Sequence, residues 1–120
     1  MDGDLERART QAELALQFAL QNNERNIIGM SRIWLGMAIS RIDPAQSEAA
    51  EQQILQGISL HEELGLPPLF GLGYMFLGEV CAASGRQKEA LEHLKKAEAL
   101  FEGMGMDFWL GRTREVLSKL

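Results

Sequence analysis

The chain has 120 residues, which is enough for one compact domain or for a short part of a larger solenoid. Apolar residues make up 46% of it and charged residues 24%, and the three prolines and few β-branched residues favour helices over a sheet. The formal net charge is −5 and the basic residues are scattered, so the basic stripe that nucleic acid requires is missing and we expect no nucleic-acid partner.

Hydrophobic spacing and turn residues predict six helices in chain order, at residues 4–23, 26–42, 50–65, 68–84, 87–103 and 107–119. Asp43-Pro44 supplies an N-cap followed by a proline, which is a usual start of a helix. Gly65-Leu66-Pro67-Pro68 ends one helix and begins the next, since proline suits only a first turn. Ser84-Gly85 is a tight break between two further helices.

The cysteine content and the apolar segments indicate where the protein works. One cysteine, Cys81, excludes an internal disulfide framework and fits a reducing compartment. The first residues contain no apolar stretch after a basic start, so no signal peptide is expected. The longest nearly apolar segment, 64–77, contains two prolines and three glycines and is too short to span a bilayer. We therefore expect a cytoplasmic protein with no membrane partner.

An internal repeat runs through the chain. Three segments align without gaps, 27–36, 69–78 and 109–118, and they lie 42 and 40 residues apart. Each begins with two bulky apolar residues and a glycine, and each ends with leucine and a small residue. A second set, 8–23, 50–65 and 90–105, fills the gaps. Its small or apolar residues share one helical face: Ala8, Ala12 and Ala15; Ala50, Ile54 and Gly57; Ala90, Leu94 and Ala97.

One stretch of this repeat resembles the tetratricopeptide repeat (TPR). It reads Tyr74-x₂-Leu77-Gly78-x₂-Cys81, then Ala90-x₃-Leu94-x₂-Ala97. The preceding unit is similar but degenerate, reading Arg32-x₂-Leu35-Gly36-x₂-Ile39, then Ala50-x₃-Ile54-x₂-Gly57, with two extra residues in its turn. Because Arg32 occupies the aromatic position and neither unit has the closing proline, the chain resembles a divergent TPR. Residues 101–117 also resemble the C-terminal ends of TPR arrays in large bacterial signalling proteins, among them predicted ATPases, nucleotide cyclases and LuxR-type regulators.

The resemblance implies an all-α fold, a right-handed superhelix of antiparallel helix hairpins. We expect a single domain over 1–120, with a half-unit at 4–23, hairpins at 26–65 and 68–105, and a capping helix at 107–119. The final helix carries Arg112, Arg114, Glu115 and Lys119, which suit a solvated cap. The first helix has no preceding sequence to cover its other side. We therefore expect either a homo-oligomer or a part of a longer array, with Met1 not necessarily the native start.

The TPR resemblance also implies a partner-binding groove, because the first helix of each TPR hairpin lines the concave surface. The residues carried over to it, beside Ser40, Arg41, Ala82 and Ala83, are Met30, Ile33, Trp34, Met37, Leu72, Met75, Phe76 and Glu79. The Lys and Asn with which some TPRs hold a terminal carboxylate are absent, so an apolar helix or apolar segment is the expected partner. The same residues could instead be core, and Trp34 and Phe76 decide between the two readings.

No group of residues predicts catalysis, a metal or a cofactor. His61 and His93 fall on different helices and at different positions of the repeat, so no metal-ligand spacing recurs. Cys81 stands where TPRs keep a buried aromatic residue, which predicts a buried thiol and not a nucleophile. Gly71 and Gly73 lack the third glycine and the strand of a dinucleotide site. We therefore expect a protein that is not an enzyme.

Two functions from different classes remain open at this point. The first is a protein-interaction or oligomerisation scaffold. The alternative is a ligand-sensing or regulatory segment of a multidomain bacterial signalling enzyme, such as a nucleotide cyclase or an ATPase regulator. The fold alone does not identify the partner or the pathway.

Overall fold

The computed structural model describes residues 2–120 and is helical throughout its regular elements. The six α-helices and one 3₁₀ turn are α1 (Asp2–Asn22), α2 (Arg25–Ile42), η1 (Pro44–Gln46), α3 (Ser47–Glu63), α4 (Pro67–Ala83), α5 (Gln87–Met104) and α6 (Asp107–Ser118). The prediction of an all-α chain with six helices is confirmed. The largest difference from the predicted bounds is at the start of α3, which begins at Ser47 and not at residue 50, directly after η1. Asp43 caps η1, because its carboxylate accepts a hydrogen bond from the Ala45 amide at 3.1 Å.

Four of the five connections between consecutive α-helices are short turns of one recurring form, and the exception is the connection through η1 between α2 and α3. Gly65, Gly85 and Gly105 have φ values of 69°, 81° and 67°, in the left-handed region that glycine enters without strain. Asn23 occupies the equivalent place after α1, with φ 53°. Each turn is closed by a backbone hydrogen bond to the carbonyl five residues earlier: Glu24 to Ala19, Leu66 to His61, Arg86 to Cys81 and Met106 to Phe101, at 2.9–3.0 Å.

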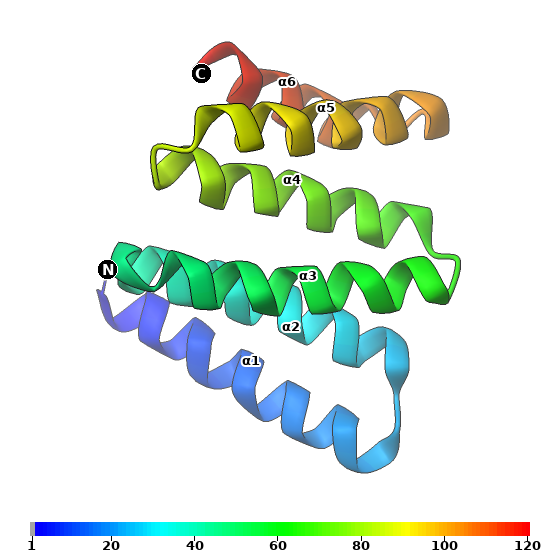
Figure 1. The fold of residues 1–120 in the computed structure, drawn as a ribbon. Helices are drawn as coiled ribbons and strands as arrows, with labels where there is room; N and C mark the ends of the chain where they lie inside the picture. The colour runs from blue at the N-terminus through cyan, green and yellow to red at the C-terminus, as the bar shows by residue number, and fades with distance from the viewer. Residues whose placement is uncertain (1) are drawn as a thin grey trace.

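The helices stack in chain order, each antiparallel to the one before it (Figure 1). Every helix packs against its neighbours in sequence, and α2 also contacts α4. In the view of Figure 1, α2 lies behind α3 and α6 lies behind α5, while α1 closes one end of the stack. The molecule measures 38 × 32 × 21 Å. Because almost all packing joins adjacent helices, residues 2–120 cover only one side of α1.

The repeated glycines permit close contact within each pair of helices. A Cβ added at Gly29 would lie 2.4 Å from the His61 ring, and one at Gly71 would lie 2.9 Å from the Phe101 ring. Gly36 and Gly78 are the last residues of the aligned segments 27–36 and 69–78. They lie against Ile54 and Leu94 in the same way. The two hairpins are therefore built on equivalent contacts, between α2 and α3 and between α4 and α5.

The core runs along the stack between these pairs. Its fully buried large side chains are Ile33, Ile54, His61, Met75, Leu77, Leu94 and Phe101, together with Cys81. His61 takes the place that Phe101 holds in the next hairpin, and its Nε2 lies 3.0 Å from the Asn26 carbonyl oxygen. Among the described residues, no helix has the length and apolar character that crossing a membrane requires.

Candidate partner-binding groove

The eight residues expected in a groove occupy three different environments. Ile33 and Met75 are 0% exposed and belong to the hydrophobic core, so we remove them from the groove. The backbones of α2, α3 and α4 come close at Ile33, since a Cβ added at Gly57 or Gly73 would lie 2.7 Å or 3.3 Å from its side chain. Helical spacing did not separate these two side chains from their neighbours, because α2 and α4 are each covered on more than one side.

The other six residues reach the surface to different extents. Met37 and Phe76 are also buried, at 4% and 6% exposed, and belong to the same hydrophobic core, whereas Met30, Leu72 and Glu79 are partly buried. Trp34 is 47% exposed, and its ring lies 5.2 Å from the ring of Phe76, centroid to centroid. Phe76 is thus a packing partner of α2, whereas Trp34 presents about half of its surface to solvent.

The structure places Trp34 in a groove between α1 and α2, which we call the α1–α2 groove. It has a volume of about 390 Å³. Its lining residues are Ala8, Gln11, Ala12 and Ala15 of α1 and Ser31, Trp34, Met37, Ala38 and Arg41 of α2. Four alanines line it, so the groove combines small apolar side chains, one tryptophan and a single cation.

Sequence reasoning did not assign α1 to this groove. The sequence places Ala8, Ala12 and Ala15 on one helical face, but it does not indicate which helices that face meets. The signal that could have revealed their role is their equivalence to Ala50, Ile54 and Gly57, the residues of α3 that support α2.

A second and smaller hollow of about 240 Å³ lies between α2 and α4. Met37, Arg41 and Glu79 are among its lining residues, and an Arg41 guanidinium nitrogen lies 3.6 Å from a Glu79 carboxylate oxygen. Burial raises the pKa of Glu79 above its ordinary value, while Arg41 and Arg112 act in the opposite direction. Because desolvation is the largest influence, the ionised form of Glu79 is less favoured in the folded protein than in the unfolded chain.

Glu79→Gln is expected to raise the melting temperature at pH 7. A carboxyl group whose pKa is raised by folding contributes stability at low pH that is lost as pH rises through the folded-state pKa. The contribution of Glu79 to stability should therefore fall as pH increases from about 4.5 through that raised value, so the stability of the wild-type protein relative to the variant should decrease over this range. Thermal unfolding between pH 4 and 8 measures the difference. If the two proteins showed parallel pH profiles, Glu79 would not be responsible.

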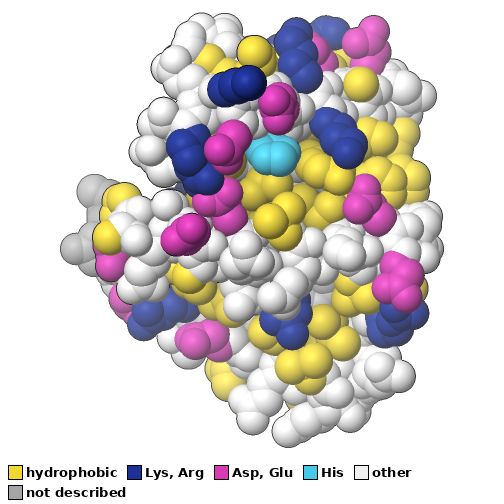
Figure 2. Space-filling view, viewed as in Figure 1, with side chains coloured by type: hydrophobic (Ala, Val, Ile, Leu, Met, Phe, Trp, Pro, Cys, Tyr) yellow, Lys and Arg dark blue, Asp and Glu magenta, His cyan; other side chains and the backbone are white. Residues whose placement is uncertain are grey.

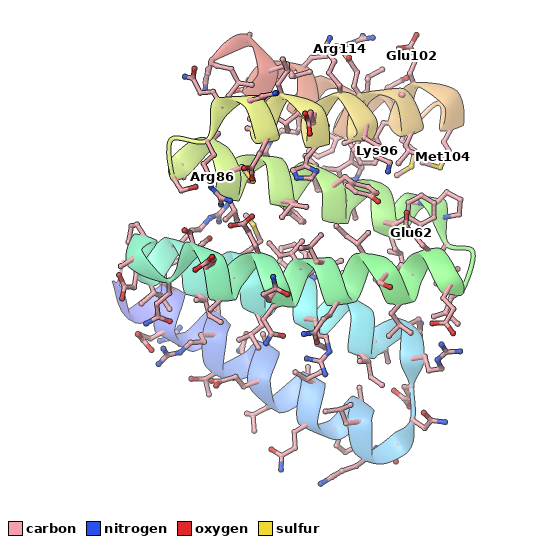
Figure 3. The ribbon with its side chains drawn as sticks, in the orientation of Figure 1. Glu62, Arg86, Lys96, Glu102, Met104 and Arg114 are labelled. Carbon is pink, nitrogen blue, oxygen red and sulfur yellow. The ribbon has the colours of Figure 1, made fainter. Side chains whose placement is uncertain are left out.

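The one group of three acidic or thiol side chains within metal-binding reach, among the described residues, consists of Glu51, Cys81 and Glu89. The Arg86 guanidinium, labelled in Figure 3, donates hydrogen bonds to both carboxylates, at 3.0 Å to Glu51 Oε1 and 3.0 Å to Glu89 Oε2. Burial, and then the nearby Glu51 carboxylate, raise the pKa of the Cys81 thiol to about 11. The thiol is therefore protonated at neutral pH, and the cation that balances the carboxylates is Arg86.

Arg86→Gln is expected to destabilise the protein by about 2 kcal/mol, since it leaves the mostly buried Glu51 carboxylate without its partner. Adding Glu51→Gln in the same chain should recover part of the loss. Arg7→Gln is the matched control, because Arg7 and Asp4 form a well-exposed pair at 3.9 Å and the change should cost less than about 0.5 kcal/mol. Urea unfolding of the four proteins measures these differences. Equal losses for Arg86→Gln and Arg7→Gln would contradict the assignment.

The aromatic residue of the TPR-like pattern, Tyr74, joins three helices. Its hydroxyl donates a hydrogen bond to Glu62 of α3 at 2.9 Å, and the Lys96 ammonium of α5 lies 4.5 Å from its ring centroid. Glu62 and Lys96 are both labelled in Figure 3. In Figure 2, apolar, acidic and basic side chains are interspersed over the face that contains these helices. Tyr74 therefore packs the stack together and does not lie in the α1–α2 groove.

In comparisons with known proteins, no family model matches the chain, and no curated protein or solved structure is similar enough to count as a relative. The resemblance to tetratricopeptide repeats rests on the sequence pattern described above.

Proposed function

We propose that this chain is a divergent TPR-like repeat protein that holds an amphipathic helix of a partner protein in the α1–α2 groove, and that it works by binding and not by catalysis. The observation that carries the proposal is the exposure of Trp34 on the wall of an apolar groove of about 390 Å³. Exposed apolar surface is costly unless a partner covers it, and tryptophan is among the residues that contribute most to protein interfaces.

The repeat supports a TPR-like superhelix, which we propose to be right-handed. Equivalent glycine contacts recur in the α2–α3 and α4–α5 hairpins, and the turns after α1, α3, α4 and α5 repeat one geometry. Stacks of this kind expose long surfaces suited to helices or extended peptides of other proteins.

A helix fits the α1–α2 groove better than an extended segment does. The groove lies between two helices and offers alanine side chains that let another helix approach closely. It presents no strand edge with which an extended peptide could pair, and helix-in-groove binding uses an apolar face of this kind. Arg41 at the groove wall favours a helix that carries an acidic residue beside its apolar face.

Selection of helical peptides from a display library tests the proposal. Wild-type protein should select amphipathic helices, and Trp34→Ala should weaken their binding at least tenfold while the far-ultraviolet circular dichroism is unchanged. Ala15→Glu should have the same effect, because it adds a charge to an exposed groove position. Leu14→Ala is the control, since Leu14 is an exposed α1 side chain that does not line the groove.

A selection that yields no helical peptide, or peptides that bind Trp34→Ala as tightly as wild type, would overturn the proposal. Thermal stabilisation by a metabolite, lost in Trp34→Ala, would instead favour the alternative of a ligand-sensing segment.

A further inference from the structure

The position of α2 within the stack provides a template for what the α1–α2 groove binds. On one side, α2 rests on α3, where Gly36 faces Ile54 and the Ala50 carbonyl, and Ile33 lies over Gly57. On the other side, α2 rests on α4. Gly73 of α4 lies close to Ile33, and the Phe76 ring contacts the ring of Trp34. Val80 and Ala83 of α4 face α2 across the hollow between the two helices.

The same support recurs one repeat earlier in the chain. The aligned segments 27–36 and 69–78 lie 42 residues apart. Subtracting 42 from the numbers of the residues that support α2 therefore gives their equivalents in α1 and α2. Ala50, Ile54 and Gly57 correspond to Ala8, Ala12 and Ala15, and Gly73, Phe76, Val80 and Ala83 correspond to Ser31, Trp34, Ala38 and Arg41. All seven of these equivalents line the α1–α2 groove. The groove is therefore a support for one more helix of the α2 type, and none of the described residues covers it.

We propose that the occupant is a helix from a partner protein that repeats the surface pattern of α2 and α4, an inference that rests on the function proposed above. That pattern is Gly29-x₃-Ile33-Trp34-x-Gly36 in α2 and Gly71-x₃-Met75-Phe76-x-Gly78 in α4. The large apolar residue packs over Ala15, the following aromatic residue contacts Trp34, and the last small residue lies against Ala8 and Ala12.

The direction of the occupant and its preferred residues follow from the same equivalence. Since α2 runs antiparallel to α3 and parallel to α4 (Figure 1), the occupant runs antiparallel to α1 and parallel to α2. Ala15 of the groove is equivalent to Ala97, which lies beneath α4, where the large apolar residue is Met75. Methionine therefore suits this position of the occupant better than a β-branched isoleucine such as Ile33.

A second copy of the chain is a poorer occupant. Its α6 is of the same type as α2 and α4, and a Cβ added at Gly111 would meet no atom within 4 Å. At the position of Ile33 and Met75, however, α6 carries Glu115. Docking α6 in the groove would bury this carboxylate over Ala15, where the lining offers no cation beyond Arg41. An apolar residue at this position removes that cost, which favours a partner helix.

The experiment uses the full chain and a peptide of its own α2 sequence, residues 25–42, carrying Ile33→Met and Trp34→Phe. The control peptide carries Gly36→Leu in addition, which blocks the closest approach of the helix. In a nuclear magnetic resonance titration of ¹⁵N-labelled protein, the first peptide should bind at least tenfold more tightly than the control. A nitroxide at its N-terminus should broaden the amide signals of Ala19 and Asn26 and leave those of Leu5 and Ile42 sharp.

Equal affinity for the two peptides, or broadening at Leu5 and Ile42 instead, would overturn the inference. So would a concentration-dependent dimer that Gly111→Leu abolishes, because a second copy would then be the occupant. Library peptides that need Trp34 but lack the pattern would leave the proposed function intact and refute only this inference. Failure of every helical peptide would refute both.

Discussion

Phe101→Ala is expected to destabilise the protein by about 4 kcal/mol, the cost of removing a large aromatic side chain from a close-packed core. Phe101 is 0% exposed, and its ring fills the space left by the missing side chain of Gly71. Truncation would therefore leave a cavity between α4 and α5 that the close backbones cannot collapse to fill. Chemical denaturation followed by circular dichroism measures the change.

Phe108→Ala is the matched control for this prediction. Phe108 is 68% exposed near the start of α6, and its main aromatic contact is Trp109 at 5.0 Å between centroids. The change should alter the free energy of unfolding by no more than about 0.5 kcal/mol. Comparable losses at the two positions would show that the core does not lie where the structure places it.

Gly36→Ala is expected to destabilise the protein by about 3 kcal/mol, although alanine is a better helix former than glycine by about 1 kcal/mol. The new Cβ would lie 2.6 Å from the Ala50 carbonyl oxygen and 2.6 Å from Ile54 Cγ1. A backbone carbonyl cannot rotate away as a side chain can, so α2 and α3 would have to separate. Thermal and urea unfolding of the variant measure the cost.

Gly111→Ala tests the same substitution where the structure leaves room for it. A Cβ at Gly111 would meet no atom within 4 Å, so the change should stabilise the protein by about 0.5 to 1 kcal/mol through helix propensity alone. If Gly36→Ala also proved stabilising, the close contact between α2 and α3 would be refuted.

The sequence allowed the helices and their repeat to be predicted because both depend on local patterns. Glycines and prolines punctuate the chain at the helix ends, and the face of small residues recurs with the spacing of the repeat. Gly36 and Gly78 were identified from this spacing alone, and the structure shows each of them against a large residue of the next helix.

The candidate site was only partly predictable. Trp34, Ile33 and Met37 lie on neighbouring faces of α2, and helical periodicity cannot tell which neighbour covers each face. The structure buries Ile33 between three helices and leaves Trp34 half open, because within the part of the chain that the structure describes no further helix lies against α1 and α2 on that side. Whether a residue is core or surface therefore depended on the number of helices in the stack.

Long-range polar contacts were also beyond sequence reasoning. Arg86 and Glu51 are 35 residues apart, and nothing in their local sequence signals that they meet. Cys81, by contrast, was expected to be buried from its position in the TPR-like pattern, and the structure buries it. The repeat pattern thus located residues within the stack but not the ion pairs that join its helices.

The most direct test of the central claim is chemical-shift mapping of a selected helical peptide on the ¹⁵N-labelled protein. The largest changes are predicted at Ala15, Ala38 and the indole of Trp34, which line the α1–α2 groove. Changes confined to the neighbourhood of Tyr74 or to α6, with the Trp34 indole unmoved, would contradict the account.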